Sequence, residues 1–283
     1  MAEAVAPPPR VLAAAWTRGR GFDVRHLPGF AAVAWFCLVA LYAPMLVLVI
    51  FSFNANRSVT IWTEFSLNWY AKAIHNEGIQ QAAILSLQVA IAATAIATIV
   101  ATMAALATTR TAPYRGLAAI YAIINQPLMV PEIVTAVATL VFFALIKEAT
   151  GVTGVGYLIF AHTVFCIPFA YMPIRARLEG MDLTYEMVAA DLYATPWRTF
   201  RRVTLPLLLP GILAGVMLSF VISLDDVVIS LLVSGPGQTT LPLYIIGQLR
   251  RGITPEMNAV STIFLAVSAL LVTLFFVFTR KKK

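Results

Sequence analysis

Charged residues are scarce in this chain of 283 residues, where Asp, Glu, Lys and Arg together make up only 12%. A soluble globular protein has about twice that share. Hydrophobic residues make up 60%, which is more than one water-soluble core can bury and far from the polar composition of a disordered chain. We therefore expect neither a single soluble domain nor a disordered protein.

The residues that usually carry catalysis or bind metals are also few. The two cysteines, Cys37 and Cys166, fall in long apolar runs, where we interpret them as small packing residues rather than as a disulfide or metal ligands. The three histidines are far apart, and His162 lies in an apolar run that favours a hydrogen-bonded structural role. The chain has no G-x-x-x-x-G-K-S/T phosphate loop and no Ser-His-Asp arrangement. The sequence therefore predicts no catalysis, no metal site and no cofactor bound by this chain.

Long runs without a charged residue are the main feature that is present. Four runs are uninterrupted, and two are broken once, by Glu132 and by the pair Asp225–Asp226. Because a membrane-spanning helix needs about 20 apolar residues, each run is long enough to cross a bilayer. The sequence predicts an all-α polytopic membrane protein with six transmembrane helices, near residues 28–53, 82–107, 117–145, 154–174, 204–232 and 258–279.

The basic residues gather on one side of these predicted helices. If the N-terminal tail, residues 1–27, is cytoplasmic, fifteen of the twenty Lys and Arg residues lie in inside segments. Basic loops are typical of the cytoplasmic side, so we expect both termini in the cytoplasm. The formal net charge of +7 is then a signal of topology, and we expect no nucleic-acid partner.

Glu132 interrupts the third apolar run. An ionised carboxylate in hydrocarbon costs several kcal/mol, so it must face a cavity, a partner or a water-filled path. Pro127 and Pro131 break the helix there, and broken backbone at membrane depth is tolerated where it lines a cavity. Polar residues near the same helical face are Asn125, Thr135 and Thr139. We interpret Glu132 as part of a pathway; the alternative is a structural glutamate satisfied by a neighbouring helix.

The Asp225–Asp226 pair lies near the end of the fifth apolar run. A helix that enters the bilayer near Thr204 places Asp225 about 30 Å away, close to the outer edge of the hydrocarbon. Small and polar residues form a stripe at helical spacing, namely Gly211, Gly215, Ser219, Ser223, Asp226 and Ser230. Asp225 is turned about 100° from this stripe. We expect at least one aspartate in a pathway; the alternative is that one only caps a helix or anchors it at the headgroups.

The longest inside connection, residues 175–202, has acidic residues early and arginines late, as the helix dipole favours. Asp182 is a candidate N-cap. Pro196 breaks the segment, which predicts two short helices with a turn around residues 193–196. The composition alone indicates a solvated connection that packs on the membrane end of the protein or docks on another protein.

This connection resembles the cytoplasmic motif of ABC importer permeases, E-A-A-x-x-x-G followed by I-x-L-P. The matching residues are Ala189–Thr195 and then Leu205–Pro210. Further segments resemble the polyamine (putrescine/spermidine) branch of these permeases, namely Leu41–Met45, Phe51–Asn54, Trp69–Tyr70, His162–Cys166, Ser223–Val228 and Ser234–Gly237. The resemblance covers nearly the whole chain from about residue 28.

The resemblance implies a type I ABC importer (MetI-like) permease fold in a bacterial inner membrane. It also implies a heterodimer with a second permease, two ATPase subunits that carry ATP–Mg, and an extracytoplasmic polyamine-binding protein. Residues 175–202 would contact an ATPase, through Met187, Ala189, Ala190, Asp191, Leu192, Tyr193, Ala194 and Arg198. Carboxylates and aromatic faces suit a chain of ammonium groups. The pathway candidates are Glu132, Asp225, Asp226, Tyr121, Phe142, Tyr157 and Tyr171.

The chain departs from the family motif at two positions. Met187 stands at the motif glutamate and Tyr193 at the motif glycine, while Glu186 is one residue away and points about 100° elsewhere. If the turn is left-handed, Tyr193 strains it by about 1–2 kcal/mol. The alternative function is a stand-alone secondary transporter or channel for small organic cations. The lack of an internal inverted repeat argues against it.

Overall fold

The computed structural model describes residues 29–58, 61–112, 114–250, 252 and 254–280. The predicted N-terminal tail, residues 1–27, lies outside these ranges, and so do the basic residues 281–283. The described residues form helices and contain no strand apart from one isolated bridge between Asn54 and Phe65. The predicted all-α class is therefore confirmed.

The chain divides into two units, Met1–Ile50 and Phe51–Lys283. Helix α1, Phe30–Phe51, accounts for nearly all of the described part of the first unit. Its 22 residues include no charge, and at 1.5 Å per residue they extend for about 33 Å, which is enough to cross a bilayer. This helix matches the predicted span near 28–53.

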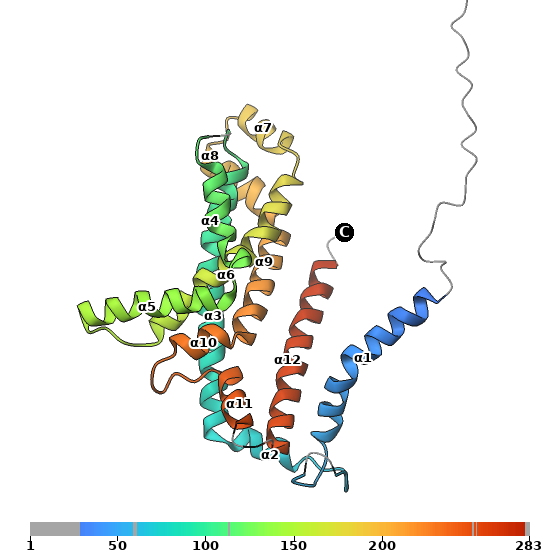
Figure 1. Ribbon diagram of the computed structural model, residues 1–283. Helices are drawn as coiled ribbons and strands as arrows, with labels where there is room; N and C mark the ends of the chain where they lie inside the picture. Colours follow the sequence, from blue (N-terminus) through green and yellow to red (C-terminus); the bar gives the residue numbers. More distant parts are fainter. Residues whose placement is uncertain (1–28, 59–60, 113, 251, 253, 281–283) are drawn as a thin grey trace, which may run out of the picture. The chain divides into compact units, whose positions relative to one another are not determined.

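Three long helices form the centre of the second unit: α3 (Glu77–Thr109), α6 (Val155–Glu179) and α9 (Leu205–Asp225), which pack on one another (Figure 1). Small residues allow this close packing. Fully buried alanines recur along α3, at Ala90, Ala93, Ala97, Ala101 and Ala105. On α9, a Cβ built on Gly211 would lie 2.6 Å from the Cβ of Arg177 on α6. Part of the predicted stripe of small residues is thus the seam between α9 and α6.

Shorter helices pack at both ends of the three long helices. Helix α4, Leu117–Met129, packs on α6. Helices α2 (Asn68–His75), α11 (Leu241–Leu249) and α12 (Pro255–Arg280) meet at the start of α3, where they share an apolar core. At this end the Asn76 side chain caps α3 and donates a 2.9 Å hydrogen bond to Glu256 on α12.

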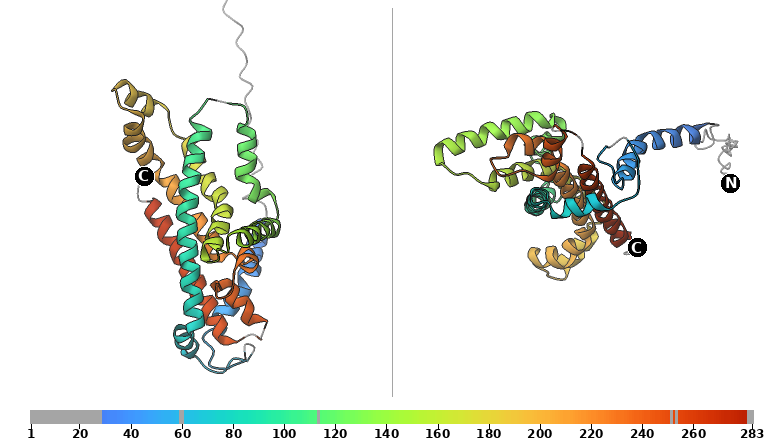
Figure 2. Two further views of the ribbon diagram at one scale, coloured as in Figure 1. Left: turned by 90° about the vertical axis from the view of Figure 1, so that its left-hand side faces the viewer. Right: turned by 90° about the horizontal axis from the view of Figure 1, so that it is seen from below.

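The predicted span 117–145 is broken at Pro131, as the sequence indicated, whereas Pro127 lies within a helix and does not break it. Helix α4 ends at Met129, and α5 begins at Glu132 and continues to Thr150. Val130 is extended, with φ −97° and ψ 138°, because a residue before proline is pushed out of the helical region. Pro131 also has no N–H to continue the hydrogen-bond ladder. As a result α5 runs across the direction of α3 instead of continuing α4 (Figures 1 and 2).

The predicted span 204–232 is also two helices. Helix α9 ends at Asp225, and α10 occupies Val228–Val233. Asp226 lies between them in an extended conformation, with φ −65° and ψ 130°. No proline or glycine lies at this second break.

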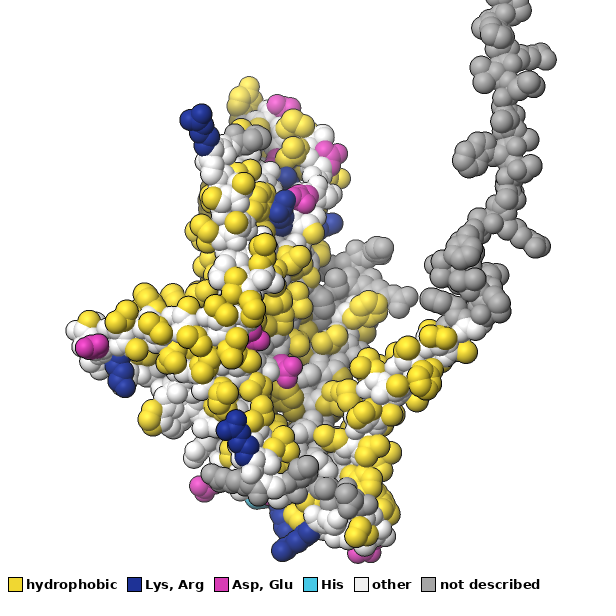
Figure 3. Space-filling view, in the orientation of Figure 1, with side chains coloured by type: hydrophobic (Ala, Val, Ile, Leu, Met, Phe, Trp, Pro, Cys, Tyr) yellow, Lys and Arg dark blue, Asp and Glu magenta, His cyan; other side chains and the backbone are white. Residues whose placement is uncertain are grey.

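Six helices of the described part are long and apolar enough to cross a membrane. This number agrees with the prediction, although the third is now α5 and the shorter α4 precedes it. Hydrophobic side chains cover much of the visible face (Figure 3). A few acidic side chains appear among the hydrophobic ones on this face (Figure 3).

Gly215→Ala should destabilise the protein by about 1–3 kcal/mol because the seam is already filled. The new Cβ would lie 2.9 Å from the Ala170 carbonyl oxygen, a backbone atom that cannot easily move. Gly247→Ala in α11 is the matched control, since a Cβ there meets nothing within 4 Å. Thermal unfolding in detergent measures the difference. Equal melting temperatures for the two variants would contradict the tight seam.

Candidate functional site

Asp226 creates the break between α9 and α10. Its carboxylate oxygens accept hydrogen bonds from the backbone N–H groups of Ser230, at 3.0 Å, and Ile229, at 3.5 Å. These are first-turn N–H groups of α10 that have no partner within the helix. A negative side chain is also favoured at the positive end of a helix. Asp226 thus caps the start of α10, and its part in a pathway stays a prediction.

His162 joins three helices at the same place. Its Nδ1 lies 3.0 Å from the Ser223 hydroxyl oxygen on α9, and its Nε2 lies 3.3 Å from the Ser230 hydroxyl oxygen on α10. The Nε2 atom is also 3.6 Å from an Asp226 carboxylate oxygen. The ring is only 1% exposed. The structural role that the sequence favoured for His162 is thus present, and the ring in addition touches a pathway candidate.

Glu132 completes this group from a fourth helix. It is the first residue of α5, and its carboxyl group interacts with the Asp226 carboxyl. We call Glu132, His162, Ser223, Asp226 and Ser230 the acidic cluster. Two neighbouring carboxylates repel each other, and a cation between them relieves that repulsion. The cluster can therefore attract a positively charged group.

The other pathway candidates lie elsewhere. Asp225 is exposed and directed away from the buried face of α9. Tyr171 is nine residues beyond His162 on α6, about 13 Å along the axis. Its hydroxyl lies 2.9 Å from the Thr108 hydroxyl, and the Arg175 guanidinium lies 4.2 Å from the ring centre of Tyr121. Tyr121 and Tyr171 thus surround an arginine at a different level of the protein.

Tyr157 lies at the start of α6 and stacks on Phe143, with ring centres 4.4 Å apart. Its hydroxyl donates a 2.8 Å hydrogen bond to the Val152 carbonyl. Both rings line a cavity of about 630 Å³ that also includes Lys147. A lysine repels cations, so this cavity is less suited to an ammonium group than the acidic cluster.

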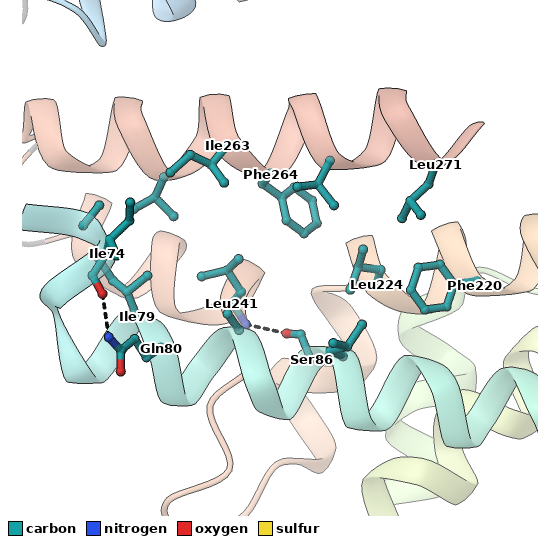
Figure 4. A pocket seen from close by; sticks show the side chains of 15 residues that line it. Ile74, Ile79, Gln80, Ser86, Phe220, Leu224, Leu241, Ile263, Phe264 and Leu271 are labelled. Atoms are coloured by element: carbon teal, nitrogen blue, oxygen red, sulfur yellow. Dashed lines mark hydrogen bonds between the residues drawn. The ribbon is translucent and has the colours of Figure 1, made fainter. Parts of the chain in front are cut away.

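A further cavity of about 440 Å³ lies among α2, α3, α9, α11 and α12 (Figure 4). Its lining is almost entirely hydrocarbon, including Phe220, Leu224 and Phe264. The Ser86 hydroxyl points toward it but already accepts a 2.7 Å hydrogen bond from the Leu241 N–H (Figure 4). Nothing in this lining holds a charged substrate.

The connection between α6 and α9 forms the second candidate region, which we call the coupling segment, residues 180–204. It contains α7 (Thr184–Asp191), α8 (Pro196–Thr199) and one turn of π-helix (Phe200–Thr204) that leads into α9. The two short helices and the turn between them confirm the prediction. Asp182 precedes α7 and accepts a 2.9 Å hydrogen bond from the Thr184 N–H, which lowers the pKa of its carboxyl group.

The turn after α7 is left-handed at Tyr193, where φ is +57°. The Ala194 N–H donates to the Ala189 carbonyl at 3.0 Å, and the Tyr193 N–H donates to the Ala190 carbonyl at 2.9 Å. This pair of bonds is the Schellman helix end, whose left-handed position is usually glycine. The strain expected for Tyr193 is therefore present in the fold. Its bonds satisfy carbonyls that would otherwise lack partners.

Glu186 ties the coupling segment to the long helices. One carboxylate oxygen lies 3.3 Å from Nε of Arg110, the residue that ends α3, and the other accepts a 2.9 Å hydrogen bond from the Thr204 hydroxyl. Sequence reasoning noted only that Glu186 was displaced from the motif, and it missed Arg110 and Thr204. No local pattern points to this contact, because Arg110 and Glu186 are far apart in the chain.

Large hydrophobic side chains are exposed along the coupling segment. They are Leu183, Tyr185, Met187, Val188, Leu192, Tyr193 and Trp197, and we call them the docking surface. Tyr193 is 94% exposed and Leu192 is 76% exposed. Of the other predicted coupling residues, Ala190, Asp191 and Arg198 are exposed, Ala194 is half-buried and Ala189 is buried. A contiguous apolar surface of this kind marks a protein or membrane contact.

Known proteins resemble this chain over most of its length. A family described as "Binding-protein-dependent transport system inner membrane component" matches residues 101–281. The chain is 39% identical over 228 residues to the putrescine transport system permease protein PotI of Escherichia coli (strain K12), covering 80% of this chain and 81% of that protein. It is 40% identical over 241 residues to the spermidine/putrescine transport system permease protein PotC of Haemophilus influenzae, covering 85% and 92%.

Solved structures agree on the fold. One is a chain of a bacterial ABC transporter involved in the import of the acidic polysaccharide alginate, with a TM-score of 0.67, 16% identity, and coverage of 91% of this chain and 94% of that one. Another belongs to the MetNI methionine ABC transporter in an inward-facing conformation, with a TM-score of 0.60, 17% identity, and coverage of 73% and 98%. The fold is that of type I ABC importer permeases, as expected.

Replacing Glu186 by Gln should loosen the coupling segment, because the ion pair with Arg110 is lost. The two side chains are 22% and 16% exposed, so we expect a loss of about 1 kcal/mol and roughly fivefold faster tryptic cleavage at Arg198. Glu179→Gln is the matched control, because its partner Arg175 lies on the same helix four residues earlier. Exchanging the charges, with Arg110→Glu and Glu186→Arg together, should restore part of the protection. Equal cleavage of all variants would show that the Glu186–Arg110 ion pair does not hold the coupling segment in place.

Proposed function

Because the chain belongs to the family of binding-protein-dependent transport system inner membrane components, we propose that it is a permease subunit of an ATP-driven importer for polyamines. The relatives described above are permeases of putrescine and spermidine systems. The observation that carries the proposal is the placement of two acidic residues, Glu132 and Asp226, at two helix breaks within the apolar part of the fold.

A polyamine is a flexible chain of ammonium groups, and the acidic cluster offers what such a group needs. Carboxylates attract an ammonium and accept its N–H groups in charge-assisted hydrogen bonds. Broken helices place these carboxylates at membrane depth without exposing backbone groups to lipid, which is typical of transport sites. Asp226 is held by α10 and His162, so Glu132 at the start of α5 is the carboxyl with fewer fixed partners.

The remaining pathway candidates extend this proposal. Asp225 is exposed beside the cluster and would meet a cation first on one side. Tyr157, near the outer end of α6 in the predicted topology, would offer an aromatic face before it. Tyr121 and Tyr171 lie toward the predicted cytoplasmic end, where the arginine between them would oppose backward movement of a cation. The second permease would close the path from the other side.

The coupling segment would connect this path to the source of energy. Its docking surface fits an apolar groove on one of two ATPase subunits, which would bind ATP–Mg themselves. An extracytoplasmic polyamine-binding protein would deliver substrate at the opposite end. This assignment requires cytoplasmic termini and a cytoplasmic coupling segment, in agreement with the position of most basic residues.

Uptake by the reconstituted complex tests the pathway. Proteoliposomes that contain both permeases and the ATPases should take up putrescine or spermidine when the loaded binding protein and ATP are supplied. Glu132→Gln should reduce uptake by roughly 10- to 100-fold, the effect of losing one charge-assisted hydrogen bond. Glu148→Gln, an exposed acid near the end of the same helix, is the control and should be neutral. Uptake by this chain alone, without ATPase, would refute the importer.

Co-purification tests the docking surface. Leu192→Glu places a charge on its most exposed part and should weaken retention of the ATPase by at least tenfold, because the charge would be buried at the interface without a partner. Leu67→Glu makes the same change on an exposed leucine before α2, at the other end of the long helices, and should retain the ATPase. Unchanged retention in Leu192→Glu would remove this surface from the interface.

A further inference from the structure

A small mixed cavity lies beside the start of α5. It has a volume of about 270 Å³ and is lined by the end of α4, one face of α5 and the first half of α6. The lining residues used below are Gln126, Thr135, Thr139, Phe142 and Phe160. The proposed function does not use this cavity, and Glu132 is only three residues before Thr135 on the same helix.

The polar groups of the cavity include one buried hydroxyl without a hydrogen-bond partner. The Thr135 side chain is 92% buried, and its hydroxyl has no hydrogen-bond partner within the described protein. The Thr139 hydroxyl donates to the Thr135 carbonyl at 2.7 Å and keeps its lone pairs as acceptors. Gln126 adds an amide oxygen. An unpartnered buried hydroxyl is costly, and a ligand with a polar group beside Thr135 would satisfy it; the hydroxyl lone pairs can accept from a hydrogen-bond donor.

Two aromatic rings line the cavity. Phe142 and Phe160 both line it, and about half of each side chain is exposed. Phe143 contacts both rings, with centre distances of 5.5 Å and 5.6 Å, and this limits their movement. The negative face of a phenyl ring attracts an ammonium group, especially where water is excluded. No charged residue lines the cavity, so no lysine or arginine occupies this role already.

The spacing along α5 relates the cavity to the acidic cluster. Glu132, Thr135, Thr139 and Phe142 follow one another at three, four and three residues, so they share one face of the helix. At 1.5 Å per residue, Thr135 and Thr139 lie about 5 and 10 Å beyond Glu132 along the axis. The nitrogens of a 1,4-diamine are five bonds apart, roughly 6 Å when extended. An alkyl chain of this length reaches from the carboxylates to the cavity.

We propose that this cavity is a second ammonium subsite, in which one end of an aliphatic di- or triamine lies against Phe142 and Phe160 and donates to the Thr135 hydroxyl while the other end meets Glu132 and Asp226. This inference rests on the proposed function, and it adds a way for the site to distinguish polyamines from monoamines. A monoamine occupies one subsite only, whereas a polyamine bridges both. The methylene chain between the two ends lies along Val134 and Ala138.

Spermidine uptake by the assembled complex measures the role of the cavity. The loaded binding protein is supplied at a saturating concentration. Thr135→Val removes the hydroxyl at nearly constant volume, and Phe142→Leu removes the ring face. Each should lower spermidine uptake about three- to tenfold and reduce the substrate moved per ATP, whereas Phe142→Trp should retain uptake because it keeps a ring. The control variants Thr273→Val and Phe276→Leu, both exposed on α12, should be neutral.

The outcomes separate the subsite from the proposed function. If wild-type complex takes up spermidine and the cavity variants match the controls, the subsite is wrong and the importer stands. If Phe142→Leu and Phe142→Trp lower uptake equally, the Phe142 ring acts by packing and the proposed subsite is also wrong. If wild-type complex takes up no polyamine, the proposed function itself fails.

Thiol labelling provides a second measurement that does not depend on turnover. In a Cys37→Ala background, Thr139→Cys should react with 2-aminoethyl methanethiosulfonate, a small ammonium reagent, and spermidine at millimolar concentration should slow the reaction at least threefold. Butylamine, a monoamine, should protect much less. Equal protection by both amines would overturn two-point binding, and no labelling in the assembled complex would mean that the second permease fills the cavity.

Discussion

Asp226 accepts the free N–H groups at the start of α10, and the arrangement of the candidate site depends on this interaction. Hydrocarbon offers no hydrogen bonds, so a helix can break at membrane depth only where side chains replace the lost partners. The carboxylate does so for α10, and the same break places it beside His162 and Glu132. The Asp226 side chain thus makes the break between α9 and α10 possible. It also places a carboxylate in the space beside this break.

The two candidate regions are linked through the most tightly packed part of the protein. Helices α6 and α9 flank the coupling segment, and at Gly211 and Gly215 they approach too closely to admit a methyl group. Glu186 adds a polar tie from the coupling segment to the ends of α3 and α9. We therefore expect that a movement of the docking surface moves α6 and α9 together. His162 lies in the opposite half of α6, and Asp226 directly follows α9.

Sequence reasoning predicted the features that depend on neighbours along the chain. Charge-free runs located the apolar helices, Pro131 marked the end of α4, and the motif spacing located the left-handed turn at Tyr193. It did not predict that Glu132 meets Asp226, because one sequence contains no information on which helices pack together. The direction of α5 was missed for the same reason, since it depends on packing against α10. Tyr121 and Tyr171 share the aromatic chemistry of a cation site, yet they contact Arg175.

The displaced glutamate of the coupling segment has a geometric consequence. Moving an acid by one position on a helix turns it by about 100°, so Glu186 faces Arg110 and cannot also face a partner. The position that faces outward is Met187, which is 57% exposed among other apolar side chains. Where the family motif offers a carboxylate and glycine, this chain offers methionine and tyrosine. A groove that binds this surface must therefore rely on apolar burial more than on charge pairing, and it must accommodate the Tyr193 ring that the left-handed turn projects into solvent.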